Sequence, residues 1–282
     1  MRESRRLPAV LTIAGSDSGG GAGIQADLRT FNSFRVYGCS VITAITAQNP
    51  DEVRRVDVLS AGSVKSQLET LLHAIPVRVA KTGMLAGKEI VECVAEIAPE
   101  YGLELVIDPV MISTSGVVLL EESAILTMKE KLFPLAKWLT PNIPEAEFIC
   151  NRKINSAADL ASAAKQLYEQ YGCNVILKSG HLPDTASDKA ADIVCYEGKL
   201  SELTSKRIPV SGNTSHGTGC TLSAALAANL ALGKHWDKAV MESKAFVCGS
   251  LAERVFLSDT LCQMYPPEKS YLDAVVLQSC EK

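Results

Sequence analysis

A glycine-rich loop directly before a long apolar segment is the part of this sequence with the clearest chemical potential. The loop is residues 213–221 (NTSHGTGCT), and residues 221–232 are apolar on almost every side, which is typical of a helix buried inside a domain. Backbone amides in the first turn of a helix have no partner within the helix, and the positive end of its dipole lies there. Phosphoryl transfer depends on electrostatic stabilisation of the transferring oxygens. We therefore expect this loop to bind a phosphate or an oxyanion.

Cys220 is the candidate base of this loop. A thiol in the first turn of a helix is expected to have a pKa below its ordinary value of about 8.5, so that Cys220 can accept a proton near neutral pH. Packing of Cys220 in the core is an equally good interpretation, because free cysteines are among the most buried residues. The nine cysteines of the chain are dispersed without a CxxC pair, which argues against a zinc site and indicates reduced thiols.

A second glycine-rich stretch, residues 15–23 (GSDSGGGAG), joins an apolar strand to a helix. Its amides can also bind an anion at the helix N-terminus, and a flexible turn packed closely on the helix is the alternative. The stretch begins a G-x-G-x-x-A match at residues 21–26, but residues 28–50 contain no acid to hold the ribose of a dinucleotide. No Lys-Ser or Lys-Thr follows the glycines, so this is not a Walker A loop. Asp27 is either a solvated carboxylate or a hydrogen-bond acceptor facing the pocket.

Polar side chains follow three further apolar strands. Asn142 and Glu145 are three residues apart at a strand end and helix start, and Asp108 also ends a strand. An amide and carboxylates can hold magnesium there, often through water, whereas ordinary helix capping is the alternative for the first two. Lys178 ends another strand and supplies a cation that can reach a nucleotide phosphate. The roles of His181 and His216, as ligands, acids or structural residues, stay open.

The elements that must position these residues alternate between short β-branched runs and helical patterns. Such alternation predicts an α/β fold with a mostly parallel sheet and helices on both faces, in which ligands bind at the carboxyl ends of the strands. Residues 192–196 and 199–204, around Glu197-Gly198, predict an antiparallel hairpin. The expected strand and helix pairs are 10–14 with 24–34, 40–46 with 64–75, 78–82 with 89–98, 103–107 with 122–132, and 138–140 with 157–170. The sequence after residue 257 gives no clear pattern.

Length and charge limit the class of protein. With 282 residues and 47% apolar content, the chain is expected to form one domain over 1–282, with residues 1–8 as a flexible start. The formal net charge of −4 argues against a nucleic-acid partner, because such binding relies on Lys and Arg. No apolar run approaches the ~18 residues of a membrane span. We expect a cytoplasmic protein that acts on a small molecule and has no membrane partner.

Taken together, six stretches resemble the hydroxymethylpyrimidine/phosphomethylpyrimidine kinases of thiamine biosynthesis, a branch of the ribokinase superfamily. The resemblance covers about residues 10–247. The stretches are residues 11–28 (LTIAGSDSGGGAGIQADL), 37–49 (YGCSVITAITAQN), 81–85 (KTGML), 108–111 (DPVM), 140–145 (TPNIPE) and 216–225 (HGTGCTLSAA).

The resemblance implies a ribokinase-like three-layer sandwich and a reaction that uses ATP and Mg²⁺. The family phosphorylates a hydroxymethylpyrimidine and then its monophosphate, and it is often dimeric, so a homodimer is expected. Cys220 replaces the aspartate base of most ribokinase relatives. The implied site residues are Gly217, Thr218 and Gly219 in the anion hole; Gly15, Asp27, Gln48, Met84 and Val110 around the pyrimidine; Asp108 and Glu145 at the metal, with Asn142 beside them; and Lys178, Asn142 and Thr214 at the nucleotide.

The sequence departs from the family pattern in two loops, and two other functions compete. Residues 114–118 (TSGVV) lack the acid that many relatives have, and Ser215 precedes His216 where relatives commonly read NTHGTGC. A pyridoxal or pyridoxine kinase is the nearest alternative, because some such enzymes retain the Gly-x-Gly-Cys loop. These tend to lack the Gln48-Asn49 pair, which favours the pyrimidine. A non-catalytic ligand sensor on a kinase fold would have lost catalytic groups such as Cys220 and Asp108, which are present.

Overall fold

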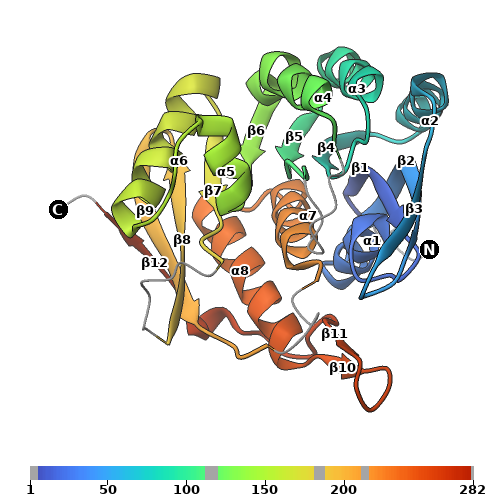
Figure 1. Cartoon of the computed structure of the whole chain (residues 1–282). Coiled ribbons are helices and arrows are strands. Elements are labelled where there is room, and N and C mark those ends of the chain that lie inside the picture. The colour runs from blue at the N-terminus through green and yellow to red at the C-terminus, as the bar shows by residue number, and fades with distance from the viewer. Residues whose placement is uncertain (1–5, 112–119, 181–187, 211–215, 281–282) are drawn as a thin grey trace.

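The fold is built on one ten-stranded sheet (Figure 1). A computed structural model describes residues 6–111, 120–180, 188–210 and 216–280 of the chain. The strands of the sheet are β1 (Ala9–Asp17), β2 (Tyr37–Gln48), β3 (Val53–Val58), β4 (Val77–Thr82), β5 (Glu104–Ile107), β6 (Ala136–Leu139), β7 (Asn174–Leu177), β8 (Lys189–Tyr196), β9 (Lys199–Lys206) and β12 (Val275–Ser279). A small second sheet pairs β10 (Val255–Phe256) with β11 (Cys262–Gln263).

The order of the strands across the sheet is β12-β9-β8-β7-β6-β5-β4-β1-β2-β3. The six central strands, from β7 to β2, are parallel. β3 at one edge and β8, β9 and β12 at the other are antiparallel. The predicted α/β fold with a mostly parallel sheet is therefore confirmed, and the carboxyl ends of the six parallel strands meet at one edge.

Helices cover both faces of the sheet (Figure 1). The helices are α1 (Gly23–Ser33), α2 (Ala61–Ala74), α3 (Lys88–Glu100), α4 (Glu122–Thr127), α5 (Ile143–Cys150), α6 (Ala157–Tyr171), α7 (Thr218–Ala231) and α8 (Trp236–Ala252), with a π-helical turn at Met128–Leu132 and 3₁₀ turns at Phe133–Leu135 and Leu272–Ala274. None of these helices in the described part of the chain has the length and apolar character needed to cross a membrane.

Each face of the sheet has its own apolar core. Along β1, Leu11 and Ile13 pack with α2, α3, α4 and α6, whereas Val10 packs with α1, α7 and α8. This split follows from the alternation of side chains along a strand. Between Thr221 and Asn229, every residue of α7 is buried, as the all-apolar sequence predicted. The first turn of α7 is thereby held against the carboxyl edge of the sheet.

The predicted hairpin is confirmed, and two strands of the large sheet are additional to the prediction, as are the short strands β10 and β11 of the second sheet. β8 and β9 join at Glu197 and Gly198, both with a positive φ, as a tight two-residue hairpin turn requires. β3 was not predicted, because almost every residue in it is exposed and several are charged. β12 lies in the segment that gave no pattern, and it pairs with β9.

Candidate active site

One large cavity runs along the carboxyl ends of the parallel strands and past the N-terminus of α7. Its volume is about 1460 Å³. Twelve of the fourteen predicted site residues line it: Gly15, Gln48, Met84, Asp108, Val110, Asn142, Glu145, Lys178, Gly217, Thr218, Gly219 and Cys220. Thr214 lies outside the described residues, as do His181, Ser215 and residues 114–118. Asp27 is described but does not line the cavity.

The two glycine-rich loops meet at the start of α7. Gly217 precedes the helix with φ of +84°, and a Cβ there would lie 1.9 Å from the carbonyl oxygen of Gly21, so only glycine fits this contact. The first intrahelical hydrogen bond runs from the Thr221 amide to the Gly217 oxygen at 2.9 Å. The amides of Gly219 and Cys220 precede it and lie in the turn where helices bind anions.

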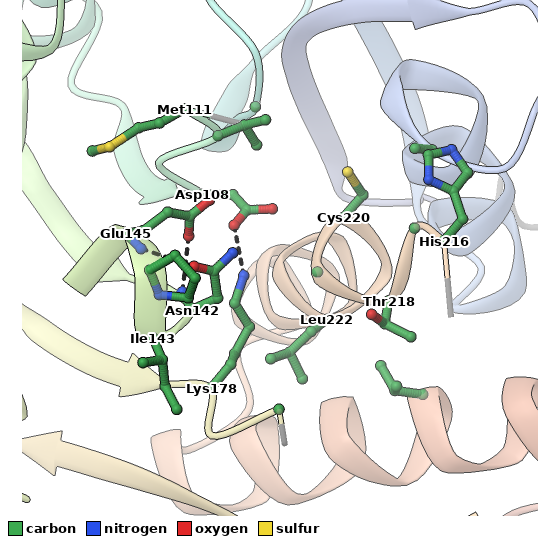
Figure 2. Close-up of a pocket in the computed structure, with 18 of the residues that line it drawn as sticks. Asp108, Met111, Asn142, Ile143, Glu145, Lys178, His216, Thr218, Cys220 and Leu222 are labelled. Atoms are coloured by element: carbon green, nitrogen blue, oxygen red, sulfur yellow. Dashed lines mark hydrogen bonds and ion pairs between the residues drawn. The ribbon is translucent and has the colours of Figure 1, made fainter. Parts of the chain in front are cut away.

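A lysine lies directly beside this turn. A Cβ on Gly219 would lie 3.0 Å from Nζ of Lys178, so glycine lets the ammonium group approach the helix. Lys178 Nζ donates to Asp108 Oδ1 at 2.9 Å (Figure 2). Burial alone would lower the pKa of Lys178, but Asp108 and Glu145 raise it above the ordinary value, so the lysine is charged. A helix start and a fixed cation therefore form one anion-binding surface.

The Cys220 thiol is half-buried and faces the cavity from the first turn of α7 (Figure 2). Burial raises the pKa of this thiol to about 11, and the carboxylates of Asp27 and Asp108 add to the rise. The charge of Lys81 and a hydrogen bond from the Gly23 amide act in the opposite direction. The sequence-based expectation of a lowered pKa is therefore wrong, because loss of water and two nearby carboxylates outweigh Lys81 and the Gly23 amide.

Asn142 and Glu145 form a capping box at the start of α5. The Asn142 side chain accepts from the Glu145 amide at 2.9 Å, and Glu145 Oε2 accepts from the Asn142 amide at 2.8 Å. Both residues also line the cavity, so the capping role does not remove them from the site. Burial, with only 6% of Glu145 exposed, raises the pKa of its carboxyl to about 7, with Asp108 adding to the rise and Lys178 opposing it.

The donor set near Asp108 and Glu145 fits a magnesium ion that is also held by phosphates. Mg²⁺ usually takes one or two carboxylates from the protein and completes its coordination with water and substrate phosphates. The two carboxylates line the same cavity as Lys178 and influence each other's charge. Among the described residues no group of three or more His, Cys, Asp or Glu side chains could hold a metal alone. A metal here would therefore depend on the nucleotide.

The opposite part of the cavity is lined mainly by uncharged groups. A Cβ on Gly15 would lie 2.8 Å from Cε of Met84. The absence of a side chain at Gly15 therefore makes room for the Met84 thioether. Gln48 Nε2 lies 3.1 Å from His216 Nε2, and Gln48 Oε1 accepts from Thr46 at 3.2 Å. These contacts hold the Gln48 amide in one orientation. We call this part, with Gly15, Gln48, Met84 and Val110, the acceptor end.

Asp27 forms a buried ion pair instead of facing the cavity. Its carboxylate is fully buried, accepts from Lys81 Nζ at 2.8 and 3.0 Å, and accepts from Thr12 at 2.6 Å. The family resemblance placed Asp27 at the pyrimidine, but in this structure its neighbour Lys81 lines the cavity instead. Sequence reasoning missed Lys81 as a site residue, although a lysine inside the apolar strand Val77–Thr82 was a signal that it has a buried partner.

A second buried pair was also missed. Lys244 of α8 donates to Asp192 of β8 at 2.6 Å, and Asp192 also accepts from the Ser179 amide at 2.9 Å. Both charged residues line the cavity. They are 52 residues apart in the sequence, and no local pattern links them. We call this part of the cavity, with Lys178, Asp192 and Lys244, the nucleotide end.

Comparisons with known proteins agree with this geometry. A family model described as phosphomethylpyrimidine kinase matches residues 17–263. The hydroxymethylpyrimidine/phosphomethylpyrimidine kinase of Haemophilus influenzae is 43% identical over 248 residues, which are 86% of this chain and 90% of the relative.

Solved structures show the same fold. Phosphomethylpyrimidine kinase from Clostridium difficile 630 superposes with a TM-score of 0.75 at 40% identity and covers 86% of this chain and 98% of its own. Pyridoxal kinase from Staphylococcus aureus in complex with AMP-PCP and pyridoxal superposes with a TM-score of 0.85 at 33% identity and covers 98% of this chain and all of its own. These matches confirm the ribokinase-like fold and the resemblance seen in the sequence: the chain belongs to the phosphomethylpyrimidine kinase family.

Proposed function

We propose that this kinase transfers the γ-phosphoryl group of ATP to 4-amino-5-hydroxymethyl-2-methylpyrimidine and then phosphorylates the monophosphate to the diphosphate, as a step of thiamine biosynthesis. One observation carries the proposal. In the view of Figure 2, Cys220 and the anion-binding turn of α7 lie between His216 of the acceptor side and the Asp108–Lys178 pair. The candidate base therefore lies where an acceptor hydroxyl and a nucleotide phosphate would meet.

The residues supply the groups that the first transfer needs. The acceptor hydroxyl gives its proton to the thiolate of Cys220, its oxygen bonds to the γ-phosphorus, and the bond from that phosphorus to the ADP oxygen breaks. The amides of Gly219 and Cys220 stabilise the transferring oxygens, and Lys178 faces them from the other side. Since the pKa of the Cys220 thiol is about 11, only a small fraction of the protein has an ionised Cys220 at neutral pH. The nearby positive charges determine the size of this fraction.

Magnesium is part of the proposal. Asp108 and Glu145 would hold it, and when bound it neutralises charge on the phosphates of the nucleotide. Asn142 and Lys178 complete the polar surface at this position. Lys178 is then shared between Asp108 and the phosphates.

The acceptor end suits an aminopyrimidine. The ring has both donors and acceptors, which a fixed amide such as that of Gln48 can read, and it has apolar faces on which Met84 and Val110 can pack. Both acceptors carry the same ring. We propose that they bind the same pocket one after the other, with the second transfer made to the phosphate introduced by the first.

Direct turnover tests this function. The purified protein is incubated with ATP, Mg²⁺ and, in separate reactions, the hydroxymethylpyrimidine, its monophosphate or pyridoxine, and both ADP and the phosphorylated products are measured. Turnover of the two pyrimidines far above pyridoxine is the expected result. Dominant pyridoxine turnover would assign the protein to vitamin B6 salvage, and binding without ADP release would support a ligand sensor.

One observation favours pyridoxal kinase as the second candidate. The family model ends at residue 263, whereas the S. aureus pyridoxal kinase covers 98% of the chain, which must include most of the residues beyond 263. Gln48 is the counter-argument, since pyridoxal kinases of this type tend to lack it. The ratio of the two turnovers decides between them.

The assembly and extent of the protein are also proposals. We propose that the chain forms one domain and that two copies form a homodimer, as is common in the resembled family. Light scattering during size-exclusion chromatography at several concentrations tests the dimer, and a monomer mass throughout would exclude it.

A further inference from the structure

A lysine and an aspartate are completely buried beneath the cavity. Lys81 lies near the end of β4 and Asp27 one turn into α1, and each side chain has 0% exposure. Both oxygens of Asp27 accept from Lys81, and Thr12 donates a third hydrogen bond. The carboxylate does not line the cavity, but Lys81 does. Asp27 therefore holds Lys81 from behind rather than contacting a ligand.

Such a pair is a poor device for stability alone. Removing two charges from water costs more than their attraction usually returns, and apolar residues of similar size often stabilise a core better. Buried charges next to a cavity are instead common where a site needs a fixed electric field. The position of Lys81 and Asp27 beside the cavity therefore indicates a role in the site rather than in stability.

The space around Lys81 keeps its ammonium group directed toward the site. A Cβ on Gly83 would lie 2.9 Å from Lys81 Nζ, so glycine leaves room for the ammonium group at the cavity wall. Burial alone would lower the pKa of Lys81, but the adjacent Asp27 raises it above the ordinary value. The lysine therefore carries a charge although no part of it is exposed.

Cys220 is the group that this charge reaches. Helix α1 contributes both the Gly23 amide, which donates to the Cys220 sulfur, and Asp27, which holds Lys81. The charged groups that act on Cys220 are Lys81 of β4, Lys178 after β7, Asp27 of α1 and Asp108 after β5. Of the two members of the buried pair, Lys81 affects the thiol more strongly than Asp27.

We propose that Lys81 is a positioning residue for catalysis, whose charge, held by Asp27, stabilises the thiolate of Cys220 from beneath the cavity. The proposal deepens the proposed function, because it rests on Cys220 accepting the acceptor proton. It does not require Lys81 to contact either substrate. Lys178 serves the phosphates on the other side of Cys220, so the two lysines have separate tasks.

The test measures Cys220 itself. Purified variants are alkylated with iodoacetamide across a range of pH, and the rate for the Cys220 peptide is followed by mass spectrometry, which separates it from half-buried Cys262 and exposed Cys280. Lys81→Met should move the profile toward higher pH, so that alkylation at a given pH slows about tenfold, the change that one pKa unit produces. Asp27→Asn removes the partner that keeps Lys81 charged and in place, so its profile should also move toward higher pH, by no more than that of Lys81→Met. An unchanged profile in Lys81→Met, or a shift toward lower pH in either variant, would overturn the proposal.

A double variant guards against misfolding. Lys81→Met alone leaves the Asp27 charge buried without a partner, so Asp27→Asn/Lys81→Met removes both charges, with thermal melting as the check on folding. Because the effect of Lys81 exceeds that of Asp27, the double variant should still alkylate more slowly than the wild type. A wild-type profile would overturn the proposal.

A matched control removes the other buried pair that lines the cavity. Asp192→Asn/Lys244→Met makes the same change of charge at the nucleotide end, where this pair is joined to the Ser179 amide. Its Cys220 profile should match the wild type, and an equal shift would show a general loss of packing and overturn the proposal. Alkylation uses no substrate, so failure to phosphorylate the pyrimidine would leave this result standing. With the correct acceptor, Lys81→Met should lower kcat about tenfold with little change in KM.

Discussion

The acceptor end and the nucleotide end of the cavity are built in different ways. The acceptor end presents neutral groups, such as Gln48 and Met84, that come from the first half of the sheet. The nucleotide end presents the ion pairs Lys178–Asp108 and Lys244–Asp192, which join elements far apart in the sequence. Neutral groups with fixed orientation select a ring by its hydrogen-bonding pattern, whereas paired charges can exchange a partner for a phosphate. Under the proposed function, selection of the ring and phosphoryl transfer therefore belong to separate parts of one cavity.

The largest effect on the rate is expected for Cys220, which we place between the acceptor end and the nucleotide end. Cys220→Ala should lower the rate of the first phosphorylation by about 10² to 10⁴, because the hydroxyl then has no base. The second phosphorylation should lose much less, since a phosphate monoester has its second pKa near 6 and is already largely ionised. Separate kinetics with each pyrimidine check this. Equal losses in both steps would assign Cys220 a role in binding or transfer rather than in proton removal.

Glu145, which lines the cavity with Lys178, makes the stability of the protein depend on pH. Its pKa is about 7 in the folded protein against an ordinary 4.5, so between these values the folded state holds a proton that the unfolded state has released. Stability from this group is complete below pH 4.5 and is lost as the pH rises through 7, by up to roughly 3 kcal/mol. Glu145→Gln should flatten this part of the profile and be relatively more stable above pH 7.

Urea unfolding of both proteins at several pH values measures the difference. Glu104→Gln changes an exposed carboxylate at the start of β5 and serves as the control, with a profile parallel to the wild type. If Glu145→Gln also runs parallel to the wild type, the carboxyl of Glu145 ionises normally in the folded state.

Gln48 tests selection at the acceptor end. Gln48→Ala should lower kcat/KM for the hydroxymethylpyrimidine about tenfold, the cost of roughly one lost hydrogen bond, and should change the value for pyridoxine less. Asn49→Ala alters the exposed neighbour and should keep the wild-type ratio between the two acceptors. An unchanged ratio in Gln48→Ala would remove Gln48 as a determinant of specificity.

The smallest effect is expected at the nucleotide end, for the buried ion pair between Asp192 and Lys244. Asp192 holds the Ser179 amide next to Lys178, so Asp192→Asn/Lys244→Met should raise the KM for ATP about three- to tenfold and leave the KM for the acceptor unchanged. Loss of the exposed Lys131–Glu92 pair through Lys131→Met/Glu92→Gln should change neither constant. A raised acceptor KM in the first variant would mean that the two ends are not separate.

The same division describes what the sequence could predict. The acceptor end lies in continuous motifs at the ends of parallel strands, which the topology alone brings to one edge of the sheet. The start of α7 is also a continuous motif, although it follows the antiparallel strand β9. The pairs Lys81–Asp27 and Lys244–Asp192 join residues 54 and 52 positions apart, so their existence depends on packing that no local pattern records. The raised pKa of Cys220 has the same origin, because it follows from burial and from carboxylates on other elements.

The fold shows a parallel contrast. Buried strands and amphipathic helices have strong periodic patterns, and those whose ranges were predicted differ from the structure by only a few residues at their ends, whereas no ranges were predicted for α5 and α8. β3 has no buried face to give a pattern, and β12 is defined by its backbone pairing with β9. The two strands of the large sheet that were missed lie at its edges, where hydrophobic pattern is weakest, and β10 and β11, which were also missed, are only two residues long.

The contact between Gly217 and Gly21 also has a thermodynamic consequence. With no room for even one carbon atom between Gly217 and Gly21, neither residue can shift toward the other, so a ligand that restrains Gly21 would also restrain Gly217. Acceptor and ATP binding are then linked, and linkage is reciprocal: whatever factor the acceptor applies to the affinity for ATP, ATP must apply to the affinity for the acceptor. The two substrates would therefore share a single coupling constant, whose structural origin is the contact between Gly217 and Gly21.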